Sequence, residues 1–234
     1  MKKITILFLG ASIFYLLGAI TVQYKLFPYP LILDFKNNTL GLTNRSKLRD
    51  NIYKIKIDLY NIYEIKQTKI VMLGDSITCG ANWKELLNNS VVNRGIGMDY
   101  TTGFINRLNN IYKINPKYVF IMGGTNDIAH NYNTVDVTFK NYIFIIKSLQ
   151  SHNIIPIVQS TLYARKSKHY NNKIQKLNTL LESYCKNNQI KFINLNKKLS
   201  KDKFLIQDYT YDGVHLNADG YKIWSNEIRQ YLYL

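Results

Sequence analysis

Short apolar runs alternate with amphipathic stretches along the chain from Lys69 onward. The apolar runs have the length of buried strands, and they lie at Lys69–Leu73, Val91–Arg94, Tyr118–Met122, Ile154–Gln159 and Phe192–Leu195. Helices are predicted at Thr101–Ile111, from a Thr134 N-cap to Leu149, at Asn171–Asn188, and at Ala218–Tyr231 behind an Asn217 N-cap. Strands that alternate with helices of this length predict an α/β fold, with a five-stranded parallel sheet covered by helices on both faces.

The N-terminus has a different pattern. Two lysines, Lys2 and Lys3, precede an uncharged apolar run from Ile4 to Val22, which is long enough to cross a bilayer as one helix. Lysines that stay in the cytoplasm place the rest of the chain on the other side. A cleaved signal peptide is the alternative, but cleavage after Ala19 would need a small residue at Leu17. We expect residues 1–22 to be a transmembrane signal anchor and the domain to be extracytoplasmic, in the periplasm or at the cell surface.

Residues 23–66 are expected to join this anchor to the domain at residues 67–234. Two prolines and the polar residues after them predict a juxtamembrane linker over Gln23–Asn44. Between Ser46 and Lys66, apolar residues recur at helical spacing, namely Leu48, Ile52, Ile55, Leu59 and Ile62. This face suits either a helix packed on its own domain or a short coiled-coil stalk. So short a run is weak evidence for a coiled coil, so we favour packing on the domain and leave the oligomeric state open.

Composition and charge narrow the function only slightly. The formal net charge is +16, but the lysines are dispersed, so we interpret most of the charge as solvated surface. No helix-turn-helix, zinc-finger or RNP-like pattern supports nucleic-acid binding. Cys79 and Cys185 lack metal-site spacing, and we favour two small buried hydrophobes over one disulfide. We expect His130, His152 and His169 to lie at the surface.

The first of four unusual loops is Gly74-Asp75-Ser76-Ile77-Thr78, directly after the first predicted strand. A Ser on a tight strand-to-helix turn is exposed at the sheet edge, where a base can reach its Oγ and its own N–H can face an oxyanion. Gly74 permits the turn without a Cβ clash. The spacing differs from that of a GxSxG elbow, and the segment alone also fits an ordinary Gly-Asp turn. Ser76 is therefore a candidate nucleophile that needs the support of the other loops.

Two further strands end in loops with candidate oxyanion donors. Asn93-Arg94-Gly95-Ile96-Gly97 follows the second strand, and the backbone N–H of Gly95 can lie close to a bound oxygen. Gly123-Gly124-Thr125-Asn126-Asp127 follows the third, and its Asn126 amide is a side-chain donor. Each loop alone fits a plain turn. Because sites in parallel sheets form at the C-terminal ends of the strands, the three loops together favour one shared site.

Two Asp-x-x-His segments compete for the role of catalytic base. Asp212-Gly213-Val214-His215 stands before the last predicted helix, and Asp127-Ile128-Ala129-His130 has the same spacing. An Asp three residues before a His can reach Nδ1, hold the right tautomer and stabilise the imidazolium. Only the first of these pairs lies at the C-terminal end of the domain, after the fifth strand, whereas Asp127 is better used to brace the Asn loop. We therefore predict His215 as the base and Asp212 as its orienting carboxylate.

Together the four loops resemble the blocks of the GDSL/SGNH hydrolase family, which are named for Ser, Gly, Asn and His. The resemblance covers roughly Lys69 to Leu234, with blocks at Val71–Thr78, at Asn93–Gly97 followed by Thr101-Thr102, at Gly124–Asp127, and at Tyr211–Asn217 running into Gly220-Tyr221. It implies a flavodoxin-like three-layer α/β/α sandwich. It also implies a Ser76, His215 and Asp212 triad, and an oxyanion hole made by the Ser76 N–H, the Gly95 N–H and the Asn126 amide.

Met98 departs from the family pattern, because close relatives often carry a small residue there. We expect it to narrow the acyl or alcohol pocket. The reaction that the resemblance implies is acyl transfer from an ester to Ser76 and then to water, with no metal or organic cofactor. The implied substrates are short acyl esters, often acetyl on carbohydrate, and an extracytoplasmic location fits cell-envelope glycans. The expected partners are thus a small-molecule or glycan ester and, through the N-terminal helix, the membrane.

Two alternatives stay open. An O-acyltransferase with the same triad would pass the acyl group to a sugar hydroxyl. A non-catalytic glycan-binding protein would keep the fold without the reaction. The acyl length and the alcohol moiety are not defined by these patterns.

Overall fold

The computed structural model describes residues 29–65 and 68–232. The chain divides between Asn51 and Ile52 into two units, and the second unit contains the whole sheet. Within the two described ranges, no helix combines the length and the apolar character needed to span a bilayer. The anchor that the sequence predicts at residues 1–22 lies outside these ranges.

Five parallel strands form the central sheet in the order β2-β1-β3-β4-β5. They are β1 (Ile70–Gly74), β2 (Val91–Gly95), β3 (Tyr118–Met122), β4 (Ile155–Gln159) and β5 (Lys191–Ile193). Strand β1 pairs with both β2 and β3, so that Gly74 lies opposite Gly95 on one side and Met122 on the other. The predicted five-stranded parallel sheet is confirmed, and its order is that of flavodoxin-like doubly wound folds.

Short and long helices connect these strands. They are α3 (Ser76–Cys79), α4 (Trp83–Leu87), α5 (Thr101–Asn106), α6 (Asn109–Tyr112), α7 (Thr125–Ala129), α8 (Val135–Gln150), α9 (Lys168–Asn187), α10 (Asn196–Leu199) and α11 (Ala218–Arg229). A small antiparallel hairpin of β6 (Ser200–Lys201) and β7 (Phe204–Leu205) and a 3₁₀ turn, η1 (Gln207–Tyr209), precede α11.

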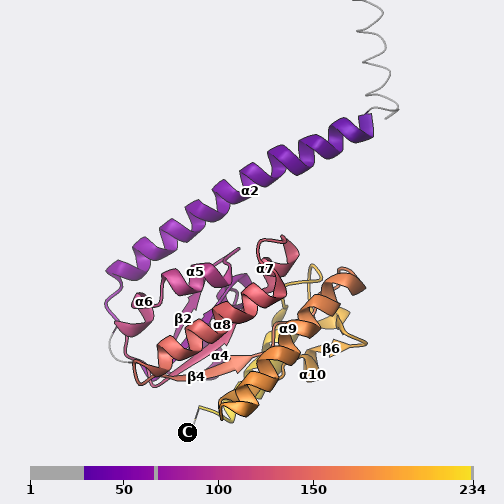
Figure 1. Cartoon of the computed structure of the whole chain (residues 1–234). Coiled ribbons are helices and arrows are strands. Elements are labelled where there is room, and N and C mark those ends of the chain that lie inside the picture. The colour runs from indigo at the N-terminus through magenta and orange to yellow at the C-terminus, as the bar shows by residue number, and fades with distance from the viewer. Residues whose placement is uncertain (1–28, 66–67, 233–234) are drawn as a thin grey trace, which may run out of the picture. The chain divides into compact units, whose positions relative to one another are not determined.

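The two faces of the sheet are buried under different helices, because alternate side chains of a strand point to opposite faces. Val71 and Leu73 of β1 belong to one core, which also contains buried residues of α5, α8 and α9. Met72, between them, belongs to the other core, with Trp83 of α4 and Trp224 of α11. Figure 1 shows α8 and α9 side by side over one face, in agreement with their many mutual contacts. The arrangement is a three-layer α/β/α sandwich.

The helix patterns were partly correct. Thr134 and Asn217 are N-caps as predicted, since their side chains accept from the Val137 and Gly220 N–H groups. The predicted helix over Thr101–Ile111 is instead two short helices, α5 and α6, with a break at Arg107. The Arg107 side chain is buried there and binds backbone carbonyls of the sheet. This tertiary demand interrupts a helix that has the expected apolar face.

Helix α2 (Tyr29–Ile62) differs from the predicted linker. Residues from Tyr29 onward are helical, although a juxtamembrane linker was expected over Gln23–Asn44. Pro30 does not prevent this, because it stands in the first turn, where backbone N–H groups have no partner within the helix.

The C-terminal end of α2 packs on the sheet domain, as favoured, but its buried side matches the predicted face only in part. The Tyr60 hydroxyl donates to the Gly95 carbonyl at 2.9 Å, and the Tyr53 hydroxyl donates to the Gly103 carbonyl at 3.1 Å. Two residues of the predicted packing face, Ile55 and Ile62, are 59% and 73% exposed. Ile52 and Leu59, on the same predicted face, are half-buried. The aliphatic periodicity therefore indicated the helix but only part of its buried side, where tyrosines make the hydrogen bonds.

Candidate active site

The nucleophile turn joins β1 to α3. Ser76 is the first residue of α3 and is half-buried, and the Asp75 side chain caps the helix by accepting the Ile77 N–H at 3.0 Å. A side chain at Gly74 would collide with Thr78 Oγ1 and the Met122 carbonyl, which explains the glycine. In the part of the chain that the structure describes, the Ser76 N–H has no protein acceptor. It is therefore available to a substrate oxygen.

The structure brings the three predicted triad residues together. His215 Nε2 lies 2.9 Å from Ser76 Oγ, and His215 Nδ1 lies 2.6 Å from Asp212 Oδ2. The other oxygen of Asp212 accepts the backbone N–H groups of Val214 and His215 at 2.9 and 2.7 Å. Burial alone would raise the pKa of Asp212, but these hydrogen bonds, led by that of the His215 ring, lower it below its ordinary value. Asp212 is thus held as a carboxylate that orients the imidazole.

The histidine loop is closed on itself by Thr210, which sequence reasoning did not single out. Its hydroxyl accepts the Gly213 N–H at 2.9 Å and donates to the His215 carbonyl at 2.6 Å. Thr210 and Leu216 also form an antiparallel bridge across the base of the loop. Gly213 has φ +85°, in the left-handed region where glycine is favoured. These contacts fix the backbone that presents His215 to Ser76.

The competing Asp-x-x-His pair has another arrangement. Asp127 is fully buried, and its carboxylate accepts from Thr101 Oγ1 at 2.6 Å and from Asn133 Nδ2 at 2.6 Å. His130 Nδ1 lies 3.3 Å from the Tyr100 hydroxyl. Asp127 therefore braces the Asn loop against the loop after β2, as the sequence indicated, while the bond to Ser76 comes from His215.

Gly95 does not occupy the predicted role in this structure. Its N–H donates to Asn93 Oδ1 at 2.8 Å, so this donor already has a partner inside the protein. The same Asn93 side chain donates to the Thr78 and Ala81 carbonyls at 3.1 and 2.9 Å. A Cβ on Gly95 would collide with the backbone of Cys79. The glycine therefore permits the close approach of β2 to α3. Its N–H was predicted to bind the oxyanion, but in this structure it binds Asn93 instead.

Further hydrogen-bond donors lie in the loops after β3 and β2. Asn126 Nδ2 donates to the Asp99 carbonyl at 3.0 Å, which fixes the amide and leaves its second hydrogen for a ligand. In the loop after β2, the N–H groups of Gly97 and Met98 have no acceptor among the described residues. Met98 has φ +60°, a conformation that a residue with a side chain seldom adopts. This turn exposes backbone donors next to Asn126, and together with Ser76 they can surround an oxyanion.

Arg107 was missed by the sequence analysis, although it ties these loops together. Its Nε donates to Asp99 Oδ2 at 2.9 Å, and its terminal nitrogens donate to the Arg94 and Gly74 carbonyls at 2.7 and 2.9 Å. The Arg107 and Asp99 side chains are 1% and 0% exposed. The guanidinium thus links the ends of β1 and β2 to the loop that carries Met98. Its position within an amphipathic pattern gave no signal of this role.

Asp75 is a second buried acid beside the nucleophile. One carboxylate oxygen caps α3, and the other has no hydrogen-bond partner among the residues that the structure describes. Burial raises the pKa of Asp75 to about 7, against the opposing hydrogen bond from the Ile77 N–H, and the nearby carboxylates of Asp127 and Asp99 raise it further. Burial therefore favours the neutral form of Asp75, next to Ser76.

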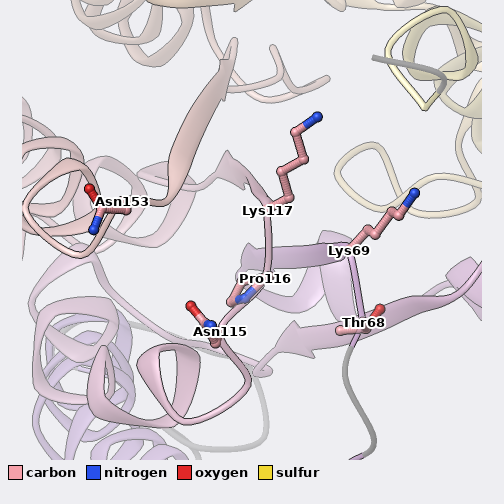
Figure 2. Close-up of a pocket in the computed structure, with 6 residues that line it drawn as sticks. All are labelled: Thr68, Lys69, Asn115, Pro116, Lys117 and Asn153. Carbon is pink, nitrogen blue, oxygen red and sulfur yellow. The ribbon is translucent and has the colours of Figure 1, made fainter.

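A pocket of about 460 Å³ lies at the opposite ends of the strands from Ser76 (Figure 2). It is lined by Thr68, Lys69, Asn115, Pro116, Lys117 and Asn153. The pocket is at the N-terminal ends of three strands, because Lys69 stands directly before β1, Lys117 directly before β3, and Asn153 shortly before β4. Ser76, in contrast, follows the C-terminal end of β1. Figure 2 shows the two lysine side chains extending from neighbouring strand ends, with no nucleophile and base pair among the labelled residues.

Among the described residues, no group of three or more His, Cys, Asp or Glu side chains could hold a metal ion. Cys79 and Cys185 are both free thiols, Cys185 buried and Cys79 half-buried.

Comparisons with known proteins agree with this class of site. The model of the GDSL-like Lipase/Acylhydrolase family matches residues 72–223, more than half of the chain. A GDSL-like lipase from Bacteroides thetaiotaomicron is 28% identical, with a TM-score of 0.69 over 77% of this chain and 97% of that one. An acetylxylan esterase from Geobacillus stearothermophilus, 17% identical, shares the fold with a TM-score of 0.58 over 72% of this chain and 95% of that one.

A curated relative, N-acylneuraminate cytidylyltransferase from Streptococcus agalactiae serotype V, is 27% identical over 172 residues. The match covers 70% of this chain, which spans only 40% of the length of that relative. The hydrogen bond between Ser76 and His215 defines the site as that of a serine hydrolase, and the family match shows to which family the chain belongs. The chain belongs to the GDSL-like lipase/acylhydrolase (SGNH) family, and it is a hydrolase that acts on ester bonds.

The two histidines should respond differently to mutation. His215→Ala removes the base bonded to Ser76 and should eliminate ester hydrolysis. His130→Ala should retain most of the rate, because the proton acceptor is still His215. The measurement is kcat/KM of both variants on one ester. An inactive His130→Ala beside a His215→Ala enzyme with normal activity would mean that the wrong pair has been assigned.

Asn126→Ala should lower kcat more than it changes KM. Loss of one oxyanion donor typically costs about 10²–10³ in turnover, because the bond strengthens as negative charge develops. Steady-state kinetics on one ester would measure this, with Asn188→Ala, at the exposed end of α9, as the matched control. A change confined to KM would show that Asn126 binds the ground state only.

Asp75→Asn should flatten the pH dependence of stability. The folded-state pKa of about 7 exceeds the ordinary value of 3.8, so stabilisation by the neutral acid is complete below the ordinary value and is lost as the pH rises towards 7. The amide stays neutral and can still accept the Ile77 N–H. Denaturant unfolding across this window should therefore show wild type losing stability relative to Asp75→Asn. Asp136→Asn, at an exposed carboxylate, is the control, and parallel curves for wild type and Asp75→Asn would contradict the assignment.

Proposed function

We propose that the protein is a serine esterase that removes short acyl groups, above all O-acetyl groups, from carbohydrate of the cell envelope. The observation that carries this proposal is the continuous hydrogen-bonded chain from Ser76 Oγ through His215 to Asp212, at 2.9 and 2.6 Å. A hydroxyl bonded to a histidine whose other nitrogen meets a carboxylate is the arrangement of an activated serine nucleophile.

The reaction follows from these contacts. Ser76 Oγ attacks the ester carbonyl carbon while His215 Nε2 takes its proton. The tetrahedral intermediate collapses as the ester C–O bond breaks, and His215 returns the proton to the leaving alcohol oxygen. Water then attacks the acyl carbon while His215 Nε2 takes its proton. The bond between the acyl carbon and Ser76 Oγ breaks, His215 returns the proton to Oγ, and the free acid departs. Asp212 holds the tautomer of His215 throughout and stabilises the imidazolium.

The oxyanion of each tetrahedral intermediate is held on the other side of the attacked carbonyl. Two of the proposed donors are those that the sequence resemblance implies, namely the Ser76 N–H and the second Asn126 amide hydrogen. Because the Gly95 N–H is already bonded to Asn93, the third donor in this proposal is a backbone N–H of the Gly97-Met98 turn. Met98 is half-buried in that turn. The proposal places its side chain on the acyl side, where it would favour short acyl groups.

Carbohydrate as the alcohol rests on support from relatives. The curated relatives are named for N-acylneuraminate, which is a sugar, and a structural neighbour is named for acetylxylan. Both names refer to carbohydrate, and an acetyl ester of a sugar is the substrate that unites them with the acylhydrolase site. The proposed location, anchored by residues 1–22 with the domain outside the cytoplasm, would expose the site to envelope glycans.

An O-acyltransferase differs only in the acceptor, and its first step would be the same. With an O-acetylated sugar as donor and an unacetylated sugar in excess, an esterase should release free acetate, whereas a transferase should produce the newly acetylated acceptor. Ser76→Ala should abolish acetate release and leave the far-UV circular dichroism unchanged. Ser151→Ala, at an exposed serine after α8, is the matched control. Activity of Ser76→Ala within a few-fold of wild type would contradict the mechanism.

A further inference from the structure

One exposed aromatic side chain stands directly beside the catalytic base. The Tyr211 ring lies nearly parallel to the His215 ring, with centroids 5.9 Å apart and 15° between the planes. Tyr211 is nevertheless 71% exposed. The loop closed by Thr210 fixes the backbone on both sides of it. Tyr211 thus presents a large flat surface to solvent at the edge of the site, from a rigid support.

The chemistry of the base determines which part of the substrate meets this surface. His215 must deliver its proton to the oxygen of the departing alcohol, so that oxygen comes within hydrogen-bonding distance of Nε2. The acyl group and its oxyanion face the donors of Ser76 and Asn126 instead. The alcohol is therefore the part of the ester that extends along the histidine loop, where Tyr211 is the neighbouring exposed side chain.

We infer that Tyr211 is a specificity-determining residue that packs against a pyranose ring of the leaving alcohol. This inference rests on the proposed function and adds to it the residue that selects the sugar. A pyranose presents a nearly flat face of C–H groups, which can cover the face of a tyrosine ring while the sugar hydroxyls stay in water. A tyrosine also keeps its own polar group at the wet edge of such a contact.

The exposure of Tyr211 favours a sugar over a long aliphatic chain as the alcohol part of the ester. A long apolar chain gains most from an enclosed, apolar groove that removes both its sides from water. Tyr211 offers a single open face, and its loop neighbours Asp212 and Gly213 add no apolar wall. An open aromatic face beside polar groups suits a ring with one apolar face and polar edges.

Two acetate esters with different alcohols test the inference, since their acyl half is the same. They are a mono-O-acetyl methyl xylopyranoside and ethyl acetate. Tyr211→Ala in the full chain should lower kcat/KM about tenfold for the sugar ester, mainly through KM, and leave ethyl acetate nearly unchanged. Tyr211→Trp, which keeps a flat face, should retain the sugar activity. Phe144→Ala removes a comparably exposed aromatic from α8 and should affect neither ester.

Equal losses of Tyr211→Ala on both esters would overturn the inference, because the ring would then act through His215 itself. No loss on either ester would overturn it as well. If wild type hydrolyses neither ester nor any other acetate, the proposed function fails, and the inference fails with it. If wild type hydrolyses both and only the Tyr211 effect is missing, the esterase proposal stands and the sugar subsite alone is rejected.

Discussion

The buried ion pair between Arg107 and Asp99 holds the catalytic edge of the sheet in one piece. Burial of two charges is costly unless their remaining hydrogen-bonding groups are satisfied. Here the guanidinium also binds the carbonyls of Gly74 and Arg94, so it joins the last residues of two neighbouring strands. Gly74 leads into the Ser76 turn and Asp99 follows Met98. The nucleophile and the backbone donors of the neighbouring loop therefore share one support.

The other loops attach to this support by hydrogen bonds of the same kind. The Asp99 carbonyl accepts the Asn126 amide, and Asp127 accepts from Thr101. His215 arrives separately, on a loop closed by Thr210, and meets Ser76 across 139 residues of sequence. An oxyanion site needs donors that are fixed before the charge develops, since donors that must reorient give part of their advantage away. The network supplies that rigidity through groups that never touch the substrate.

The parts that the sequence predicted are those that local pattern determines. The buried strands stand out as apolar runs. Ser76 follows the end of β1, and Asp212 and His215 stand just before α11, each within a recognisable motif. Arg107 was missed because an inward-facing arginine looks like any polar position of an amphipathic helix until its carbonyl partners are placed in space. The Gly95 N–H was misassigned because its acceptor, Asn93, lies only two residues away and competes for it. The packing face of α2 was predicted only in part, because Tyr53 and Tyr60 make hydrogen bonds that a count of aliphatic residues ignores.

Covalent labelling tests the central claim most directly, because it needs no knowledge of the natural substrate. A fluorophosphonate reacts with a serine only where a base removes its proton and donors receive the developing charge. Labelled full-length protein would be digested and the modified residue located by peptide mass spectrometry. The account predicts a single adduct on Ser76, which is lost when His215 is replaced by Ala. No adduct, or an adduct on another serine with Ser76 unmodified, would contradict it.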